Sequence, residues 1–564
     1  MAVQTPTSVA ASSRGRPTSL LRDAGRLVWR HPWVLTAVLC ALLLVLPATG
    51  GDLAAQEFHT WVFAHRGAVL WNDYWYGGHL LGGYSLLTPP LAALVGTRLL
   101  GALACIAAAA AASSIFNGTV GEGTVGEGTV GEGTVGDGYP DFPTARAARL
   151  GALWFSVGCV GSLIVGQIPF GVGVALALTA WLAVMRRHPW WAAVAALAAS
   201  LASPLAGAFL LMAAVAWCLD IGVRRAAPLA TAAAGIGLAS LIGGGGFFPF
   251  PRRALAIVLL FVLGGWLLVP VRSAALRAGI LLYGLSSIAV FLIHSPVGGN
   301  MGRLGALVGG PLAVAVLARR QLWKTLVVAA VPLLAWQLWP MGTSITRSST
   351  DPSSRASYYS GLNAFLRTQD VADGRVEVPN LVQHWEAYYV AKDFPLSRGW
   401  ERQIDLRYNE ILYHPDLTAN QLHAWMVRAG VGLVAIPDAP VDYWSQWEVA
   451  IVNAGQPWLQ PVWSDAHWRV WRLTDSRGLV TGPATLTHLG VDSFTLAPNG
   501  VGPSLVRVHW SPYWRVSSGN ACVSPGADDW TTVNVKGTGP VVVTARWSLA
   551  AAVLPSHAPT RCPA

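Results

Sequence analysis

The chain has 564 residues, of which 53% are hydrophobic and only 12% carry a charge. Soluble domains carry roughly a quarter charged residues, so this composition excludes an ordinary soluble protein and indicates a part that lies in lipid. The net charge of +10 does not indicate nucleic acid, because many arginines fall in short loops between apolar runs, as orientation signals do. We therefore expect membrane lipid, and no nucleic acid, as a partner.

Residues 1–31 contain five arginines and little that could pack. This pattern indicates a basic cytoplasmic tail, because no small-residue cleavage site of a signal peptide follows it. Residues 32–340 alternate apolar runs with short loops, and about 20 apolar residues in a helix cross a bilayer. We predict an α-helical polytopic membrane domain over 32–340 with about 11 transmembrane helices. The predicted spans are residues 32–50, 97–116, 150–168, 170–185, 189–203, 205–221, 227–246, 254–271, 274–293, 304–318 and 322–340.

The positive charges predict which side each loop faces, because cytoplasmic loops are enriched in Lys and Arg. The loops that share the predicted side of the N-terminus hold Arg146, Arg149, Arg186, Arg187, Arg224, Arg225, Arg272, Arg277, Arg319, Arg320 and Lys324. Only Arg252 and Arg253 break this pattern. An odd number of spans then places residues 341–564 outside. We predict a multi-pass protein of the cell membrane with a cytoplasmic N-terminus and an extracytoplasmic C-terminal region.

A five-residue repeat, "TVGEGTVGEGTVGEGTVGDG", lies in the predicted cytoplasmic loop 117–145. Glycine at this density is expensive to order. We interpret the insert as a flexible linker and assign it no function.

The first predicted external loop, residues 51–96, begins with "GDLAAQEFHTWVFAHRGAVLWNDYWYGGH". If its start is helical, Asp52, Gln56 and His59 lie on one face and Glu57 points partly away. The aromatic residues suit a membrane interface, where a ring has one apolar and one wet side. They suit stacking on sugar rings equally well, and the local pattern leaves both interpretations open.

The composition changes after residue 340. Residues 341–475 mix helical patterns with short strands and predict an α/β module, whereas residues 476–564 alternate in period two and predict a β-sandwich. Cys522 and Cys562 are the cysteines of this polar part, and a disulfide between them suits an oxidising exterior. Two unpaired thiols are the alternative.

The segment "HWEAYYV…RGWERQID" concentrates aromatic and charged residues in the α/β module. These residues are His384, Trp385, Glu386, Arg398, Trp400, Glu401 and Arg402. They suit the wall of a sugar-binding cleft, and equally a buried ion-pair cluster that joins the exported part to the membrane domain. No HExxH or CxxC spacing occurs, so we assign no metal ligands.

An early acidic residue in the first external loop, many spans and an exported C-terminal region resemble the GT-C superfamily of polyprenyl-phosphate-sugar-dependent glycosyltransferases. More closely, "GDLAAQ", "LWNDYWYGGHLLGGYSLLTPPLAAL", "GQIPFGVGVALAL", "ASPLAGAFLL", "HSPVGGNMGRLGALVGGPL", "VPNLVQHWEAYYVAKDFPLSRGWERQIDLRYN" and "GVGLVAIPDAP" resemble actinobacterial membrane proteins grouped as related to 6-pyruvoyl-tetrahydropterin synthase. The resemblance implies a GT-C-like membrane fold.

The resemblance also implies that a carboxylate of this loop acts as a base or metal ligand, and Asp52 holds the matching position. Such a carboxylate takes the proton of an attacking hydroxyl. Many GT-C members have adjacent acidic residues, whereas here Leu53 follows Asp52 and the next carboxylate is Glu57, which is the second catalytic candidate. No cofactor is assigned with certainty, and a divalent metal ion (Mg²⁺ or Mn²⁺) stays open.

A lipid-phosphate leaving group needs positive charge beside it. We expect Arg303, in "GGNMGRLG", to bind the donor phosphate, with His294 and Arg98 as further candidates. Besides the cluster of the α/β module, the predicted substrate-binding residues are Gln56, His59, Asp73, Trp75 and Tyr76.

These observations favour an integral membrane glycosyltransferase. It would move a sugar from a polyprenyl-phosphate donor to an extracytoplasmic glycan or lipid acceptor of the cell envelope, with inversion. One alternative is a non-catalytic envelope-assembly protein with a GT-C-like fold. Another is a transporter or flippase for lipid-linked glycans.

Overall fold

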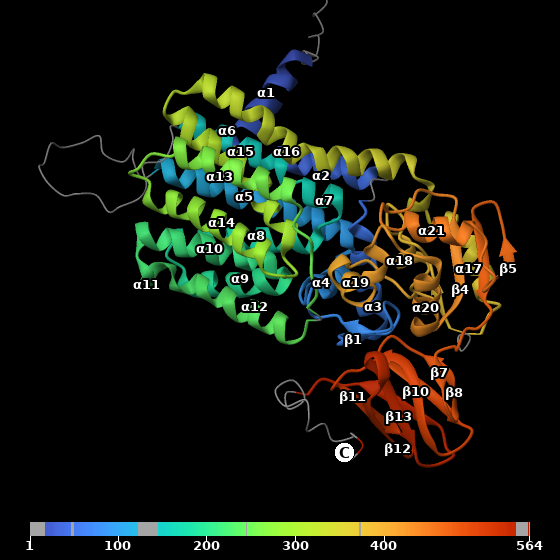
Figure 1. Cartoon of the computed structure of the whole chain (residues 1–564). Coiled ribbons are helices and arrows are strands. Elements are labelled where there is room, and N and C mark those ends of the chain that lie inside the picture. The colour runs from blue at the N-terminus through green and yellow to red at the C-terminus, as the bar shows by residue number, and fades with distance from the viewer. Residues whose placement is uncertain are drawn as a thin grey trace, which may run out of the picture.

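The computed structural model describes residues 17–46, 50–121, 145–243, 245–370, 374–548 and 562. Most of the TVGEG repeat and residues 1–16 of the predicted tail lie outside the described residues. The described chain is mostly helical and ends in a region rich in β-strands. Figure 1 shows a bundle of long helices, with an α/β module at one end of it.

Hydrophobic helices that start at prolines or after short loops build the bundle. They are α1 (Pro17–Arg30), α2 (Trp33–Val45), α5 (Thr97–Gly121), α6 (Ala145–Gly158), α7 (Gly161–Val165), α8 (Ile168–Met185), α9 (Pro189–Ala202), α10 (Pro204–Ile221), α11 (Val223–Ala226), η1 (Ala227–Ala230), α12 (Thr231–Leu241), α13 (Arg252–Leu268), α14 (Ala274–Leu292), η2 (Gly298–Met301), α15 (Gly302–Arg319) and α16 (Trp323–Thr350). Proline is favourable in a first helical turn because its missing N–H has no intrahelical partner there.

Seven of the described helices are long and apolar enough to cross a membrane. They are Thr97–Asn117, Ala145–Val165, Ile168–Met185, Pro204–Ile221, Ala274–Leu292, Gly298–Arg319 and Trp323–Thr350. A bent pair, Arg22–Arg30 with Trp33–Val45, would make an eighth. The prediction of about 11 spans is therefore wrong in number. Helices do form at the other predicted spans, but α2, α9, α12 and α13 have only 13, 14, 11 and 17 residues, fewer than the roughly 20 that a crossing needs.

Several of the arginines predicted to be cytoplasmic lie together at one end of the bundle. Arg146 of α6 lies over the ring of Trp323 at the start of α16, 5.9 Å from its centre. Arg320, just after α15, donates a 2.7 Å hydrogen bond to the carbonyl of Leu268 at the end of α13. Helix ends distant in the sequence thus share one basic surface, which is consistent with the charge pattern of a membrane domain.

The segment that follows α2 forms the layer between the bundle and the later modules. It contains α3 (Leu53–Arg66), β1 (Trp71–Asn72), β2 (His79–Leu80) and α4 (Thr88–Val95). β1 and β2 pair antiparallel, with Asn72 opposite His79. The expected helix after Asp52 is therefore present as α3.

The α/β module follows α16. Its elements are η3 (Pro352–Ser354), η4 (Ala356–Tyr359), α17 (Ser360–Leu366), β3 (Arg375–Glu377), α18 (Glu386–Tyr389), α19 (Arg402–Tyr408), η6 (Glu410–Tyr413), α20 (Ala419–Ala429), β4 (Val431–Pro437), α21 (Gln446–Asn453), β5 (Leu459–Ser464) and β6 (Trp468–Leu473). The strands lie in the order β3-β4-β6-β5. Only the β3–β4 pair is parallel. Every residue of β4 is buried, as expected for a strand at the centre of a covered sheet.

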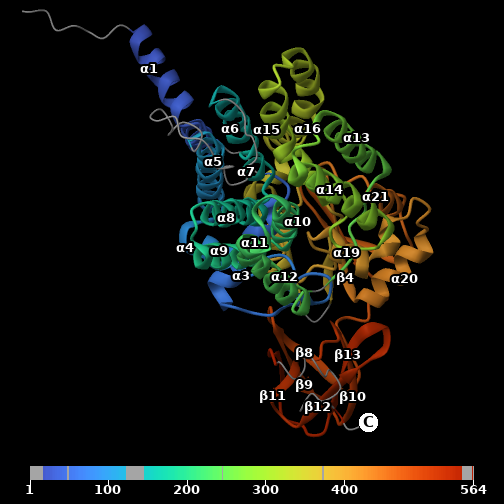
Figure 2. The same cartoon turned by 90° about the vertical axis from the view of Figure 1, so that its left-hand side faces the viewer.

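Two four-stranded antiparallel sheets make up the last part of the chain. Their strands are β7 (Val480–Thr481), β8 (Ala484–Leu489), β9 (Ser493–Pro498), β10 (Gly502–His509), β11 (Trp514–Ser518), β12 (Ala521–Pro525), β13 (Trp530–Val535) and β14 (Val541–Ala545). The orders are β12-β13-β10-β7 and β11-β14-β9-β8, and both sheets contribute to one hydrophobic core. Cys522 of β12 forms a disulfide with Cys562. This region lies below the junction of the bundle and the α/β module in Figures 1 and 2.

The largest hydrophobic core runs from the bundle into the α/β module without a break. Trp75, between β1 and β2, is fully buried there. Its ring stacks on Phe58 of α3 at 4.3 Å, and its indole N–H donates a 3.1 Å hydrogen bond to the carbonyl of Ala387 in α18. One side chain thus bonds the segment between β1 and β2 to the α/β module.

Replacing this indole should destabilise the whole protein. We expect Trp75→Ala to lower the free energy of unfolding by about 3–5 kcal/mol, because a large buried side chain leaves a cavity. Trp447→Ala is the matched control, since Trp447 of α21 is 44% exposed and should change stability by no more than about 0.5 kcal/mol. Thermal unfolding of both variants in the same detergent measures the difference, and equal shifts would contradict the role of Trp75.

Candidate functional site

Asp52 is placed by a close backbone approach between the start of α3 and the turn that joins α7 to α8. The Asp52 N–H donates a 3.2 Å hydrogen bond to the carbonyl of Val165. A Cβ on Gly50 would collide with the backbone of Val165, and one on Gly166 would collide with the backbone of Leu53. Gly166 also has φ +91°, a conformation that glycine adopts easily. The "GDL" and "GQIP" motifs therefore fix the position of Asp52 together.

Arg303 lies beside Asp52. Its Nη2 is 3.9 Å from Oδ2 of Asp52, and the two side chains remain 22% and 25% exposed. The guanidinium also lies over the ring of Phe170, 5.5 Å from its centre. Burial raises the pKa of the nearby Tyr84, Asp52 adds to this rise and Arg303 opposes it. A carboxylate, a guanidinium and a phenol thus meet at the end of the bundle that faces the α/β module.

The other charged candidates lie in different surroundings. Burial raises the pKa of Glu57, while Thr97 and Arg98 oppose the rise. Arg98 donates hydrogen bonds to the carbonyls of Leu43 and Leu46 at the end of α2. These contacts cap a helix C-terminus, where a positive charge is favourable.

His294 is exposed and its ring lies 4.7 Å from that of Phe247. The structure therefore brings Arg303 to Asp52 and gives Arg98 and His294 other neighbours.

A second cluster lies deeper, where α3, β2 and the start of α19 meet. One ligand-type atom from each of His59, His79 and Glu401 lies within 4.8 Å of the others, and all three residues are buried. Nε2 of His59 is 3.3 Å from Oε1 of Glu401. Burial lowers the pKa of His59 to about 4, and burial together with the neighbouring His59 lowers the pKa of His79 to about 3. Burial raises the pKa of Glu401 to about 8.

The sequence patterns did not join these three residues. His59 was expected to bind substrate, Glu401 was expected in the polar and aromatic cluster of the α/β module, and His79 was not singled out. The residues come from separate segments and follow no metal-binding spacing. The one available signal was the density of histidine and aromatic residues around "WNDYWYGGH".

Three further substrate-binding candidates of this segment are buried and bonded within the protein. Asp73 accepts a 2.5 Å hydrogen bond from the indole N–H of Trp71, and burial raises the pKa of Asp73 well above its usual value. The Tyr76 hydroxyl accepts a 2.6 Å hydrogen bond from the Glu401 N–H. Trp75, described above, completes the set. Trp75 and Tyr76 hold the segment against the α/β module, whereas the Asp73 bond lies within the segment.

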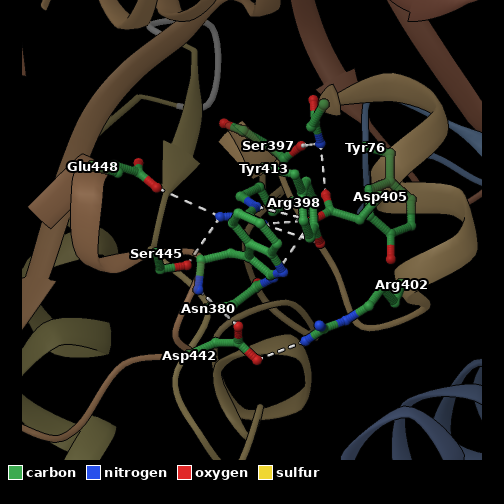
Figure 3. Close-up of polar contacts among 12 residues, drawn as sticks. Tyr76, Asn380, Ser397, Arg398, Arg402, Asp405, Tyr413, Asp442, Ser445 and Glu448 are labelled. Atoms are coloured by element: carbon green, nitrogen blue, oxygen red, sulfur yellow. Dashed lines mark hydrogen bonds and ion pairs between the residues drawn. The ribbon is translucent and has the colours of Figure 1, made fainter. Parts of the chain in front are cut away.

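Arg398 lies at the centre of a buried polar network, shown in Figure 3. It donates hydrogen bonds of 2.6 and 3.1 Å to Oδ2 of Asp405, and its Nη1 is 3.5 Å from Glu448. The Tyr413 hydroxyl donates to the same Asp405 oxygen at 2.6 Å. The arginine is 2% exposed. Of the two interpretations left open for this residue, its contacts are those of a buried ion-pair cluster.

His384 stands between this network and Asp52. Its ring stacks on Trp400 with an interplanar angle of 8°, and its Nδ1 is 3.7 Å from Oε1 of Glu386. A Cβ on Gly51, the neighbour of Asp52, would lie 3.7 Å from the His384 ring. His384 has φ +56°, and strained backbone of this kind concentrates at functional sites.

Trp385 stacks on Tyr389, with ring centres 5.1 Å apart. It is buried and belongs to the core that supports His384 and Glu386.

Buried polar atoms without a hydrogen-bond partner gather along this junction. They include Gln56 Nε2, His59 Nε2, His79 Nδ1, His79 Nε2, Gln383 Oε1, His384 Nδ1, Trp385 Nε1 and Glu386 Oε2. An unsatisfied buried polar atom typically costs about 1–3 kcal/mol. Their concentration in one place indicates a site that holds water or a ligand.

Comparison of the chain with models of protein families and with curated proteins finds no match. The GT-C resemblance therefore stays a prediction.

Loss of the central guanidinium should be severe. We expect Arg398→Ala to lower the free energy of unfolding by about 3–5 kcal/mol, because it leaves two buried carboxylates without their cation. Arg367→Ala is the control, since Arg367 pairs with Asp393 at 2.9 Å on the surface and is 60% exposed; its loss should cost less than about 1 kcal/mol. Unfolding midpoints of both variants measure this, and a mild Arg398→Ala would contradict the ion-pair interpretation.

The stability of the protein should fall as the pH rises through the window set by Glu386. Burial raises the pKa of this carboxyl from 4.5 to about 8, so between these values the folded state keeps a proton that the unfolded state has lost. The contribution of Glu386 to the free energy of unfolding is then fully present below about pH 4.5 and is lost as the pH rises toward 8. The slope of the free energy of unfolding against pH measures how many protons are bound on unfolding or folding. We expect Glu386→Gln to change this number by about one proton in this pH range.

Unfolding measured across this pH range provides the test, with Glu410→Gln, at an exposed position, as the control. An unchanged slope in Glu386→Gln would show that the carboxyl is ionised in the folded state.

Proposed function

We propose that this chain is an integral membrane glycosyltransferase of the GT-C type. It transfers a sugar from a polyprenyl-phosphate donor to an extracytoplasmic glycan or lipid acceptor of the cell envelope. The observation that carries the proposal is the pairing of Asp52 with Arg303 at the end of the apolar bundle, with both side chains about one-quarter exposed. A lipid-borne phosphate and a polar acceptor can meet only at such a boundary.

The chemistry needs one base and one cation. An acceptor hydroxyl attacks the anomeric carbon, Asp52 takes the hydroxyl proton, and the bond from that carbon to the phosphate oxygen breaks. The lipid phosphate leaves with the electron pair, and Arg303 neutralises its charge. A single displacement of this kind inverts the anomeric configuration.

The surroundings support these two roles. Arg303 follows the glycine-rich η2 at the start of α15, so its guanidinium lies at the edge of the bundle rather than within it. His384 lies beside Gly51, and its buried ring stacks on Trp400, whose partly exposed ring forms an aromatic wall there. This wall suits an acceptor sugar, because aromatic faces pack against apolar surfaces while polar tips bond hydroxyl groups.

The arrangement has a sidedness. In our proposal the end of the bundle with the α/β module faces the cell exterior and the basic end with Arg146 and Arg320 faces the cytoplasm. The clustering of these arginines supports this orientation.

One observation favours a second candidate, a non-catalytic envelope-assembly protein. The residue after Asp52 is Leu53, which is buried, and Glu57 lies near Thr97 and Arg98. The acidic pair of many GT-C enzymes is therefore not formed within α3.

A transfer assay distinguishes the two. Purified full-length protein with labelled polyprenyl-phosphate sugars should form a labelled acceptor, and Asp52→Asn should reduce the rate about 10²–10⁴-fold, because the amide cannot take a proton. Asp393→Asn is the control on the α/β surface and should keep the wild-type rate.

Transfer at the wild-type rate by Asp52→Asn would remove this residue as the base. A wild-type protein without transfer activity would favour the assembly protein, and movement of lipid-linked glycan without a new bond would favour a flippase.

A further inference from the structure

Three buried side chains from three segments converge at the junction between the bundle and the α/β module. His59 comes from α3, His79 from β2 and Glu401 from the residue before α19. Their ligand-type atoms lie within 4.8 Å of one another. The exposed fractions are 6%, 1% and 8%.

Hydrogen bonds do not account for these groups. Among the described residues, neither ring nitrogen of His79 has a partner of good hydrogen-bond geometry, although the backbones of Trp75 and Asn72 lie close enough to oppose the fall in its pKa. Nε2 of His59 has no such partner either, although Glu401 is only 3.3 Å away. Buried histidines normally satisfy at least one nitrogen. A metal ion would satisfy both rings and the carboxylate at once.

We propose that His59, His79 and Glu401 bind a transition-metal ion of the zinc class. Imidazole nitrogen with one carboxylate oxygen is a ligand set that such ions accept, with three protein ligands and one open position. Mg²⁺ and Ca²⁺ prefer ligand sets of oxygen and are a poor match.

The distances agree with a tetrahedral site. A metal with ligand bonds of about 2.0–2.1 Å has ligand atoms roughly 3.3–3.4 Å apart along a tetrahedral edge. The His59–Glu401 separation of 3.3 Å already has this length. No other separation in the cluster exceeds 4.8 Å, so binding requires only a small inward movement of the ligands.

Neighbouring residues support the ligands. The ring of His79 lies parallel to that of Trp75, with an interplanar angle of 5°. The backbone N–H of Glu401 donates to the Tyr76 hydroxyl. Such contacts orient metal ligands and tune their affinity.

Bound metal would join α3, β2 and the α/β module beside the Asp52–Arg303 pair. The ring of His59 lies 6.3 Å from that of Tyr84, whose pKa responds to both Asp52 and Glu401. The proposal stands on the three ligands alone and does not depend on glycosyl transfer.

Metal analysis of the full-length protein tests the proposal. The protein is purified in detergent with an affinity tag free of histidine, stripped with a chelator and incubated with Zn²⁺ or Co²⁺. We expect one bound ion per chain. Bound Co²⁺ should give the strong visible absorption band of a tetrahedral site, and added Zn²⁺ should raise the unfolding temperature.

His79→Ala and Glu401→Ala should lose the stoichiometric ion and the Co²⁺ band. His423→Ala is the control, because His423 of α20 pairs with Asp475 and lies outside the cluster, and it should keep both.

Wild-type protein that binds no ion after incubation would overturn the proposal without any variant. So would one ion per chain that survives in folded His79→Ala. If either ligand variant fails to fold, the Co²⁺ spectrum of the wild-type protein still tests the proposal. A spectrum typical of octahedral Co²⁺ with only oxygen ligands would exclude binding by imidazole.

Discussion

The burial of residues 71–80 between three parts of the chain is the constraint on which the rest of the arrangement depends. Trp71 enters the core of the β-rich region, 5.4 Å from Trp514, whereas Trp75 stacks on Phe58 of α3. Two indoles of one short segment therefore belong to two different cores. Large aromatic side chains bury more apolar area than any others, so separating either core from this segment would expose that area to water.

Main-chain hydrogen bonds complete the same junction. The carbonyl of Tyr74 accepts from the Leu396 N–H at 2.8 Å, and the carbonyl of Gly77 accepts from the His509 N–H at 2.7 Å. Residues 71–80 thus extend the hydrogen bonding of both later modules. Polar groups that line a junction held this way have little freedom to reorganise, and preorganised groups are the ones that stabilise developing charge most effectively.

Sequence patterns predicted the local elements well and the assembly poorly. Apolar runs gave the helices of the bundle and period-two alternation gave the final strands, because both depend on neighbouring residues. The span count was too high because hydropathy alone does not show where a helix ends, as α9 and α12 illustrate. Asp52 and Arg303 were expected together from their places at external boundaries. The meeting of His59 with Glu401 could not be predicted, since only tertiary packing brings these segments together.

The two carboxylates near Tyr84 occupy different environments, and this difference separates what each can do. Asp52 is one-quarter exposed and lies beside a guanidinium. Glu401 is buried beside two imidazoles, and burial raises its pKa to about 8. Burial disfavours the ionised form of this carboxyl, and a bound metal ion would reverse that effect by placing a positive charge beside it. In our proposals a mobile substrate anion has Arg303 as its partner and a fixed cation serves Glu401, so the two carboxylates have separate roles.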